Sequence, residues 1–248
     1  MKISNNCFAI TGLYCVTPWS VNAGFIVGDK KTLVIDAGSN YISARTIYGY
    51  AKTAKPSNEM MLINTEKHLD HIGGNGLFRE NNVDIYGHFL LNRKQEDLAN
   101  WIVGINGSIA EERRRHANEG AIAFEKTEIV NPNCRIEKEG EIDLGGIAAK
   151  VLMTTGHTDT NISVYCEQDN VLFCGDCIVQ KLIPNIEEDG IEMLNAWGKS
   201  LEKIAELQPD ILVPGHGDII YGKNILEEIE RTRKILTETI KAKGKRND

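Results

Sequence analysis

Four side chains of the kinds that bind metal ions lie within six positions of the stretch NTEKHLDHIGGN. They are Glu66, His68, Asp70 and His71. Residues two apart in an extended segment point to the same side, so Glu66 and His68 can reach one ion from a single loop. Asp70 and His71 come where the chain turns toward a glycine pair, and they can face a neighbouring position. The spacing therefore predicts a metal site.

Three more turns that contain glycine carry the same kind of side chain. TTGHTDTN contains His157, FCGDC contains Asp176 and LVPGHGD contains His216. These turns and the first stretch together hold four of the six histidines of the chain. One histidine in a turn is more often a satisfied polar residue than a ligand. A set of this composition instead predicts that distant parts of the chain converge on bound metal.

The turns follow stretches that have the composition of strands. Short runs rich in β-branched or aromatic residues, ended by glycine or aspartate, are typical of strands, and they cover 8–14, 23–29, 31–38, 60–65, 83–88, 135–157, 161–176 and 211–216. Helical patterns cover 42–55, 73–81, 196–210 and 223–243. Strands that alternate with helices predict sheets covered by helices. The ionisable residues lie at strand ends, where rigid sheets commonly hold binding groups.

Length and composition favour one domain over 1–248, with a helical insertion at about 89–125 and a C-terminal helix at about 223–243. No apolar run approaches the roughly 20 residues that cross a bilayer, and the N-terminal stretch lacks the apolar core of a signal peptide. We therefore expect a cytoplasmic protein with no membrane partner. A net charge of −7 disfavours nucleic acid as a partner. The six scattered cysteines are expected to be free thiols.

Together the motifs resemble those of the metallo-β-lactamase superfamily. Its hallmark is a His-x-His-x-Asp-His block, followed by a separate histidine, a bridging aspartate and a last histidine. Here Glu-x-His-x-Asp-His stands in the first block, and the other three motifs follow in the same order. The resemblance runs from about residue 20 to 220. It implies an α/β (α+β) fold, the four-layer αββα sandwich of two mixed β-sheets, with the metal site along one edge.

The resemblance also implies how the ligands divide between two divalent ions. One ion would take Glu66, His68 and His157. The second ion would take Asp70, His71 and His216. Asp176 would bridge the two.

Position 66 departs from the pattern, because histidine is usual there. With Glu66, three carboxylates and one hydroxide cancel the four positive charges of two divalent ions. Zinc is the expected metal because it accepts carboxylate oxygen, and iron and manganese are the alternatives because a carboxylate suits harder ions. A different possibility is that Glu66 points away and leaves the first position with fewer ligands.

The chemistry expected of this set is metal-dependent hydrolysis of a small-molecule ester, thioester or lactone. Two metals roughly 3.5–4 Å apart can hold a bridging hydroxide and polarise a carbonyl oxygen. Asp70 can orient the attacking water or receive its proton. The alternative is a non-hydrolytic diiron protein that reduces or senses oxygen or nitric oxide.

Five further residues have weaker indications. Tyr14 and Trp19 are candidates for substrate contact, because the superfamily often places a mobile loop over the site between the first two strands; the alternative is that they pack in the core or on the surface. His88 ends a strand and is a candidate neighbour of the ligands. Cys174 and Cys177 flank the bridging aspartate, and we leave both out of the ligand set.

Overall fold

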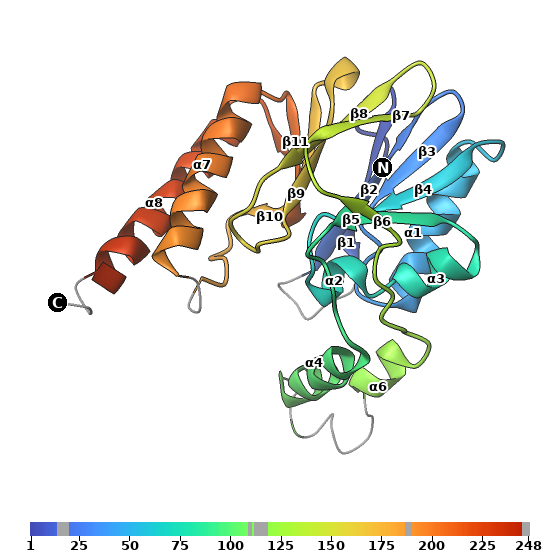
Figure 1. The fold of residues 1–248 in the computed structure, drawn as a ribbon, viewed down its shortest axis with the longest axis horizontal. Helices are drawn as coiled ribbons and strands as arrows, with labels where there is room; N and C mark the ends of the chain where they lie inside the picture. The colour runs from blue at the N-terminus through green and yellow to red at the C-terminus, as the bar shows by residue number, and fades with distance from the viewer. Residues whose placement is uncertain (14–19, 109–110, 112–118, 187–189, 245–248) are drawn as a thin grey trace.

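The computed structural model describes residues 1–13, 20–108, 111, 119–186 and 190–244. Its strands form a curled sheet in two halves, with helices on the outer faces (Figure 1). The first half contains β1 (Cys7–Leu13), β2 (Val21–Val27), β3 (Lys31–Ile35), β4 (Glu59–Ile63), β5 (Asp84–His88) and β6 (Cys134–Ile136). The second contains β7 (Gly140–Asp143), β8 (Ala148–Met153), β9 (Ile162–Cys166), β10 (Val171–Val179), β11 (Ile211–His216) and β12 (Ile220–Tyr221).

Both halves are mixed, as the resemblance to the superfamily implies. In the first half β3, β4, β5 and β6 run parallel, and β1 and β2 join them in antiparallel pairs. In the second half β10 and β11 are parallel and the remaining pairs are antiparallel. The order β6-β5-β4-β3-β2-β11-β10-β9-β8-β7 is continuous, because Val21 of β2 pairs with His216 of β11. The two expected sheets are therefore hydrogen-bonded to each other at the end of β11.

Side-chain alternation along the strands explains the four layers. In β3, Leu33 and Ile35 face a central core shared with the second half, whereas Val34 faces the outer helices. In β10, Phe173 points into the same central core and Leu172 points outward. Strands buried on both faces read as continuous apolar runs. The predicted αββα fold class is confirmed.

The helices cover the two outer faces. α1 (Tyr41–Ala54) and α3 (Asn75–Glu80) pack on the first half, and α7 (Ile191–Leu207) and α8 (Asn224–Gly244) pack on the second. α1 begins where the Asn40 side chain accepts a hydrogen bond from the Ser43 backbone N–H at 2.8 Å. α7 begins at Ile191, before the predicted 196. A short helix that the sequence did not predict, α2 (Leu69–Ile72), follows β4.

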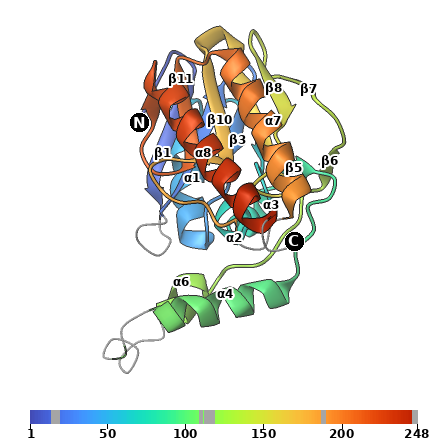
Figure 2. The same cartoon turned by 90° about the vertical axis from the view of Figure 1, so that its left-hand side faces the viewer.

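Two helices of the predicted insertion at about 89–125 lie beside each other at one end of the molecule, away from the sheets (Figures 1 and 2). They are α4 (Gln95–Ser108) and α6 (Glu119–Phe124), and they pack through Leu98, Ile105 and Phe124. Within the described part of the chain, no helix has the length and apolar character that would let it cross a membrane.

Candidate metal centre

Four strands lead the predicted ligands to one edge of the sandwich. β4 runs into the loop and helix α2 that carry the Glu-x-His-x-Asp-His block, and β8 runs into the turn with His157. Asp176 lies within β10, where the register against β11 shifts at Gly175. Such an irregularity re-aims the following side chain. β11 ends at His216.

The structure brings all seven predicted residues into two adjacent groups. The first group is Glu66, His68, His157 and Asp176, and the second is Asp70, His71 and His216. Within each group, one donor atom per residue lies within 4.8 Å of the others. The shared edge of the sandwich therefore contains the two clusters that the sequence predicts.

In the first group, Glu66 points inward. Its side chain is fully buried, and Oε1 lies 2.7 Å from Nδ1 of His68. Nε2 of His157 lies 3.2 Å from that same His68 nitrogen and 4.0 Å from Oε1 of Glu66. The conformation in which Glu66 points away is thus not the one in the structure.

In the second group, His216 contacts Asp70. Nε2 of His216 lies 3.2 Å from Oδ2 of Asp70, and Nδ1 faces the Ser20 carbonyl at 3.2 Å. Nε2 of His71 lies 4.0 Å from the same Asp70 oxygen. An imidazole held through one nitrogen presents the other in a fixed direction.

Asp176 contacts both groups. Its Oδ2 lies 3.4 Å from Nε2 of His157 and 3.2 Å from Nε2 of His216. Its Oδ1 lies 3.3 Å from Nε2 of His71. The glycine at 215 leaves room for this carboxylate, because a Cβ there would collide with Oδ1 of Asp176.

The donor atoms of this cluster fit divalent cations. Buried atoms of this cluster that have no hydrogen-bond partner in the described part of the chain include Glu66 Oε2, His71 Nε2 and Asp176 Oδ1. Buried polar atoms normally have a partner, so several orphans in one place call for an explanation. Zinc and similar ions bind carboxylate oxygen and imidazole nitrogen, so bound metal would satisfy such atoms.

Opposite charges balance within the protein itself. Burial alone would lower the pKa of His216, but Asp176 and Asp70 outweigh burial and raise it to about 10. Burial alone would raise the pKa of Asp176, but His216 and His71 hold it well below its usual value. The carboxylate is therefore ionised at neutral pH, in the form that binds a cation, whereas His216 would release its proton on binding one.

A residue that the sequence analysis missed supports His71 from behind. Oδ2 of Asp36 lies 2.9 Å from Nδ1 of His71 and accepts a hydrogen bond from Thr65 Oγ1 at 2.7 Å. The Thr65 backbone N–H donates to Oδ1 of Asp36 at 2.7 Å. Asp36 comes directly after β3, in the run KTLVIDAG, so the strand-end rule applied to the other ligands could have found it.

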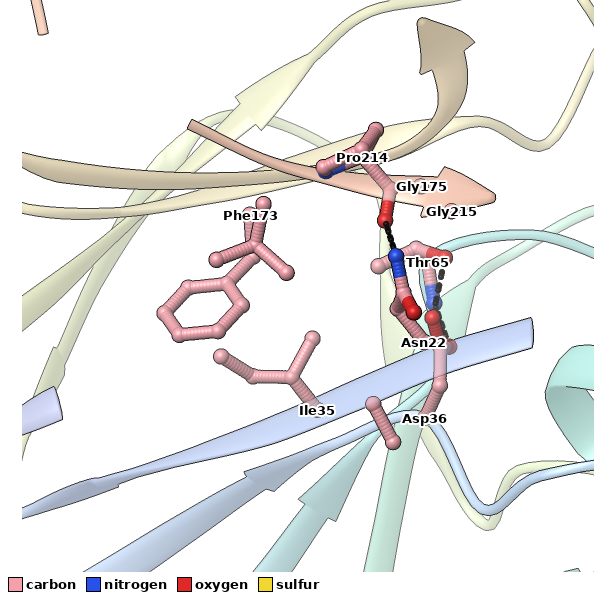
Figure 3. Close-up of a pocket in the computed structure, with 10 residues that line it drawn as sticks. Asn22, Ile35, Asp36, Thr65, Phe173, Gly175, Pro214 and Gly215 are labelled. Carbon is pink, nitrogen blue, oxygen red and sulfur yellow. Dashed lines mark hydrogen bonds between the residues drawn. The ribbon is translucent and has the colours of Figure 1, made fainter. Parts of the chain in front are cut away.

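A small cavity lies beside this support, between the two halves of the sheet (Figure 3). Asn22 lines it and donates from Nδ2 to the carbonyls of Pro214 and Gly217, at 2.9 and 2.8 Å. These two carbonyls flank His216 along the chain. Asn22 of β2 therefore fixes the end of β11 that presents His216.

Of the remaining predicted residues, those that the structure describes are not part of either group. Tyr14 and Trp19 lie outside the described residues. His88 is buried at the end of β5, where its Nδ1 accepts the Leu90 N–H at 3.2 Å.

Cys174 and Cys177 are buried in the core beneath α7 and are not in the ligand groups. Burial raises the pKa of the Cys177 thiol to about 12 and that of Cys174 well above its usual value. Both thiols are therefore protonated at neutral pH, which disfavours them as metal thiolates.

Comparison with known sequences places the chain among metal-dependent hydrolases. The sequence model described as "Metallo-beta-lactamase superfamily" matches residues 16–216. The "Probable metallo-hydrolase YqgX" of Bacillus subtilis (strain 168) is 26% identical over 206 residues, which cover 82% of this chain and 87% of that protein. The "Hydroxyacylglutathione hydrolase" of Francisella tularensis subsp. novicida (strain U112) is 27% identical over 154 residues. That match covers 58% of this chain and 61% of the hydrolase.

Solved structures share the fold. The "Metallo-beta-lactamase from Pontibacter korlensis" superimposes with a TM-score of 0.70 and covers 96% of this chain and 97% of its own. The two sequences are 17% identical. At that identity the likeness extends to the architecture and not to a substrate.

Proposed function

This chain belongs to the metallo-beta-lactamase superfamily and is a metallo-hydrolase, and from that premise we propose that it uses two divalent ions to hydrolyse a small thioester, ester or lactone. In this proposal Glu66, His68 and His157 hold one ion, and Asp70, His71 and His216 hold the other. Asp176 binds both.

The observation that carries the proposal is the position of Asp176 between the two groups. One of its oxygens lies within 3.4 Å of a histidine from each group, and the other lies 3.3 Å from His71. A carboxylate with two oxygens is suited to bridge two cations, and a paired site can supply both a water of lowered pKa and a Lewis acid for the carbonyl oxygen of the substrate. A single ion would leave one group of buried donors unsatisfied.

A divalent ion bound here would polarise the substrate carbonyl and bring the pKa of a bound water toward about 7. The protein then has to hold the reactants and accept a proton. Asp70 is the candidate catalytic base, because its carboxylate is ionised. Burial alone would raise the pKa of Asp70, but His71 and His216 outweigh burial and lower it below its usual value. Cys177 is not a competing nucleophile, since its buried thiol keeps its proton.

The hydroxyacylglutathione hydrolase named above supports a thioester as the first substrate class to test. Because that match covers about three fifths of each protein, it suggests the bond that is cleaved and not the whole substrate.

Glu66 bears on the identity of the metal. Its inward carboxylate offers the first group an oxygen ligand where a histidine at position 66 would offer nitrogen. An oxygen ligand favours harder ions such as iron or manganese beside zinc. The same observation supports the second candidate function, a non-hydrolytic diiron protein that reduces or senses oxygen or nitric oxide.

The test loads protein purified without metal with zinc, manganese or anaerobic ferrous ion and counts the bound ions. Each form is then assayed with a hydroxyacylglutathione thioester, an aryl ester, a lactone and a phosphodiester. We expect two ions per chain and thioester or ester hydrolysis that a chelator abolishes and added metal restores. Wild-type protein that binds no divalent ion, or stays fully active after chelation, contradicts the proposal. An iron form with an oxygen-sensitive visible chromophore and no hydrolysis selects the diiron function.

A further inference from the structure

An ion pair joins the loop that carries Glu66 and His68 to the turn that carries His157. Nζ of Lys67 lies 2.6 Å from Oδ1 of Asp159. We propose that this pair is a latch, and that Lys67 and Asp159 are positioning residues which hold the two loops in register for metal binding. The inference rests on the proposed function, because it assigns a role to residues that act through the ligands.

The latch joins segments that are far apart in the chain. Lys67 stands between Glu66 and His68, and Asp159 follows closely after His157. The ion-paired residues are 92 positions apart. Any shift of one loop against the other therefore changes the 3.2 Å separation between His68 Nδ1 and His157 Nε2.

The latch acts beside other contacts between these loops. One is a backbone hydrogen bond, in which the Ile162 N–H donates to the Thr65 carbonyl at 2.8 Å. Another is the contact between His157 Nε2 and His68 Nδ1. The backbone bond alone lets the loops pivot about it. A further tie, through the side chains of the latch, opposes that rotation.

The turn that carries Asp159 is itself fixed by local bonds. The Gly156 N–H donates to the Thr158 carbonyl at 3.0 Å, and the Thr160 N–H donates to Thr158 Oγ1 at 3.3 Å. Because these bonds close the turn on both sides of Thr158, His157 and Asp159 move as one unit. A displacement of the Asp159 carboxylate therefore also displaces the His157 imidazole.

The expected contribution of the latch to metal affinity follows from the solvent exposure of its two side chains. The side chains of Lys67 and Asp159 are 31% and 43% exposed, so water screens their attraction. Partly exposed pairs of this kind change an equilibrium by about fivefold at most. Because the pair restricts two loops and not a core, its loss should weaken metal binding more than it weakens folding.

The chain offers a matched control. Nζ of Lys150 lies 2.6 Å from Oε2 of Glu167, and the Lys150 side chain is 32% exposed. This pair joins β8 to the turn after β9 and includes no neighbour of a predicted ligand. Lys150→Met thus removes an ion pair of the same length, made by a lysine of nearly the same exposure, at a different place.

The test compares wild type with Lys67→Met, Asp159→Asn, the reversed pair Lys67→Asp/Asp159→Lys, and Lys150→Met. Zinc affinity is measured by competition with a chromophoric chelator, and kcat and KM are measured on the best substrate. We expect about fivefold weaker binding of one ion in each single variant, with a lower kcat and little change in KM. The reversed pair should return to within about twofold of wild type, and Lys150→Met should equal wild type.

Metal-free protein gives an independent readout. Amide hydrogen exchange at Ile162 should be faster in Lys67→Met and Asp159→Asn than in Lys150→Met, because the loops pivot more freely. Lys67→Gln replaces Lys67→Met if the latter does not fold.

Single variants that bind zinc as tightly as wild type overturn the latch. A reversed pair as weak as the single variants also overturns it, because the charges would then act separately. If the wild type binds no metal, the proposed function fails, and the exchange at Ile162 alone decides the latch.

Discussion

Nδ1 of His71 lies 2.9 Å from Oδ2 of Asp36, a residue 35 positions earlier in the chain. A carboxylate in this position accepts the Nδ1 proton and leaves the Nε2 lone pair free, which in His71 faces Asp176 and Glu66. Asp36 adopts a left-handed backbone conformation, with φ of 61°, and its side chain is held by Thr65. Strain of this kind persists where the surrounding structure holds it.

Replacing Asp36 by asparagine should weaken metal binding by about 10–100-fold, the range seen when such supporting partners are removed. The amide has no negative charge and leaves the His71 tautomer undetermined. Chelator competition measures the affinity. Asp29→Asn, at a side chain that is 81% exposed, is the control and should change nothing. An unchanged affinity in Asp36→Asn would show that His71 needs no such support.

The two histidine variants His68→Ala and His216→Ala should each remove one ion, whereas Asp176→Ala should weaken both. The reason is that Asp176 contacts histidines of both groups, His157 and His216 through Oδ2 and His71 through Oδ1. Metal analysis after dialysis counts the ions, and hydrolysis is expected to fall to background in all three variants. A fully active variant that lacks metal would refute metal-dependent chemistry at this site.

Glu66→His restores the histidine that is usual in this motif, and it should shift the metal preference toward zinc. We expect the ratio of zinc to manganese affinity to rise by about tenfold, or ~1.4 kcal/mol, because imidazole is the softer ligand. Competition between the two metals, followed by elemental analysis, measures the ratio. Glu59→His, at an exposed position of β4, serves as the control. A ratio that is the same in both variants means that Glu66 does not bind the ion.

Removing metal should lower the melting temperature. Ligand at 100 times its Kd stabilises the folded state by about 2.7 kcal/mol, and each kcal/mol corresponds to about 2–4 °C in a protein of this size. Chelated protein should therefore melt roughly 5–11 °C lower, and zinc should reverse the loss. Differential scanning calorimetry checks this, with magnesium as the control ion. Thermal unfolding transitions that coincide with and without chelator would mean that the ligand cluster binds no metal ion.

Asp169 should contribute to stability at neutral pH and lose that contribution in acid. Burial alone would raise the pKa of Asp169, but hydrogen bonds from Ser4 and Asn6 outweigh burial. The pKa of Asp169 is therefore lower in the folded protein than in the unfolded chain. A carboxylate of this kind stabilises the fold above its unfolded pKa, and the gain disappears as pH falls through the folded pKa.

Asp169→Asn should therefore lower the melting temperature at pH 7 by about 2–4 °C, which corresponds to about 1 kcal/mol after allowance for exposure. The difference from wild type should shrink below about pH 4, near the ordinary value for aspartate. Asp218→Asn, at an exposed carboxylate, is the control. A difference that is independent of pH would assign the effect to packing and not to ionisation.

Short-range pattern was enough to predict the candidate ligands and the strands, and the four layers followed from the resemblance to the superfamily. Glu66, His68, Asp70 and His71 are close in sequence, and glycine turns after apolar runs marked the other three. The apolar runs at 31–38 and 161–176 likewise predicted strands, and the structure shows that β3 and β10 in these runs are buried on both faces. The start of α7 was predicted too late, although Ile191 and Leu194 continue the apolar spacing of Trp197, Leu201 and Ile204 toward the N-terminus.

The sequence by itself determined which side chains are available and in what order, because residue type and local spacing are properties of the chain. Only the tertiary structure decided that Glu66 turns inward, that Asp176 faces both groups and that Asp36 stands behind His71. It also brought Lys67 to Asp159. Each of these relationships joins segments from different strands, and it depends on the register of the sheets and on how the two halves close. Backbone pairing across the whole fold sets both, and no local pattern encodes them.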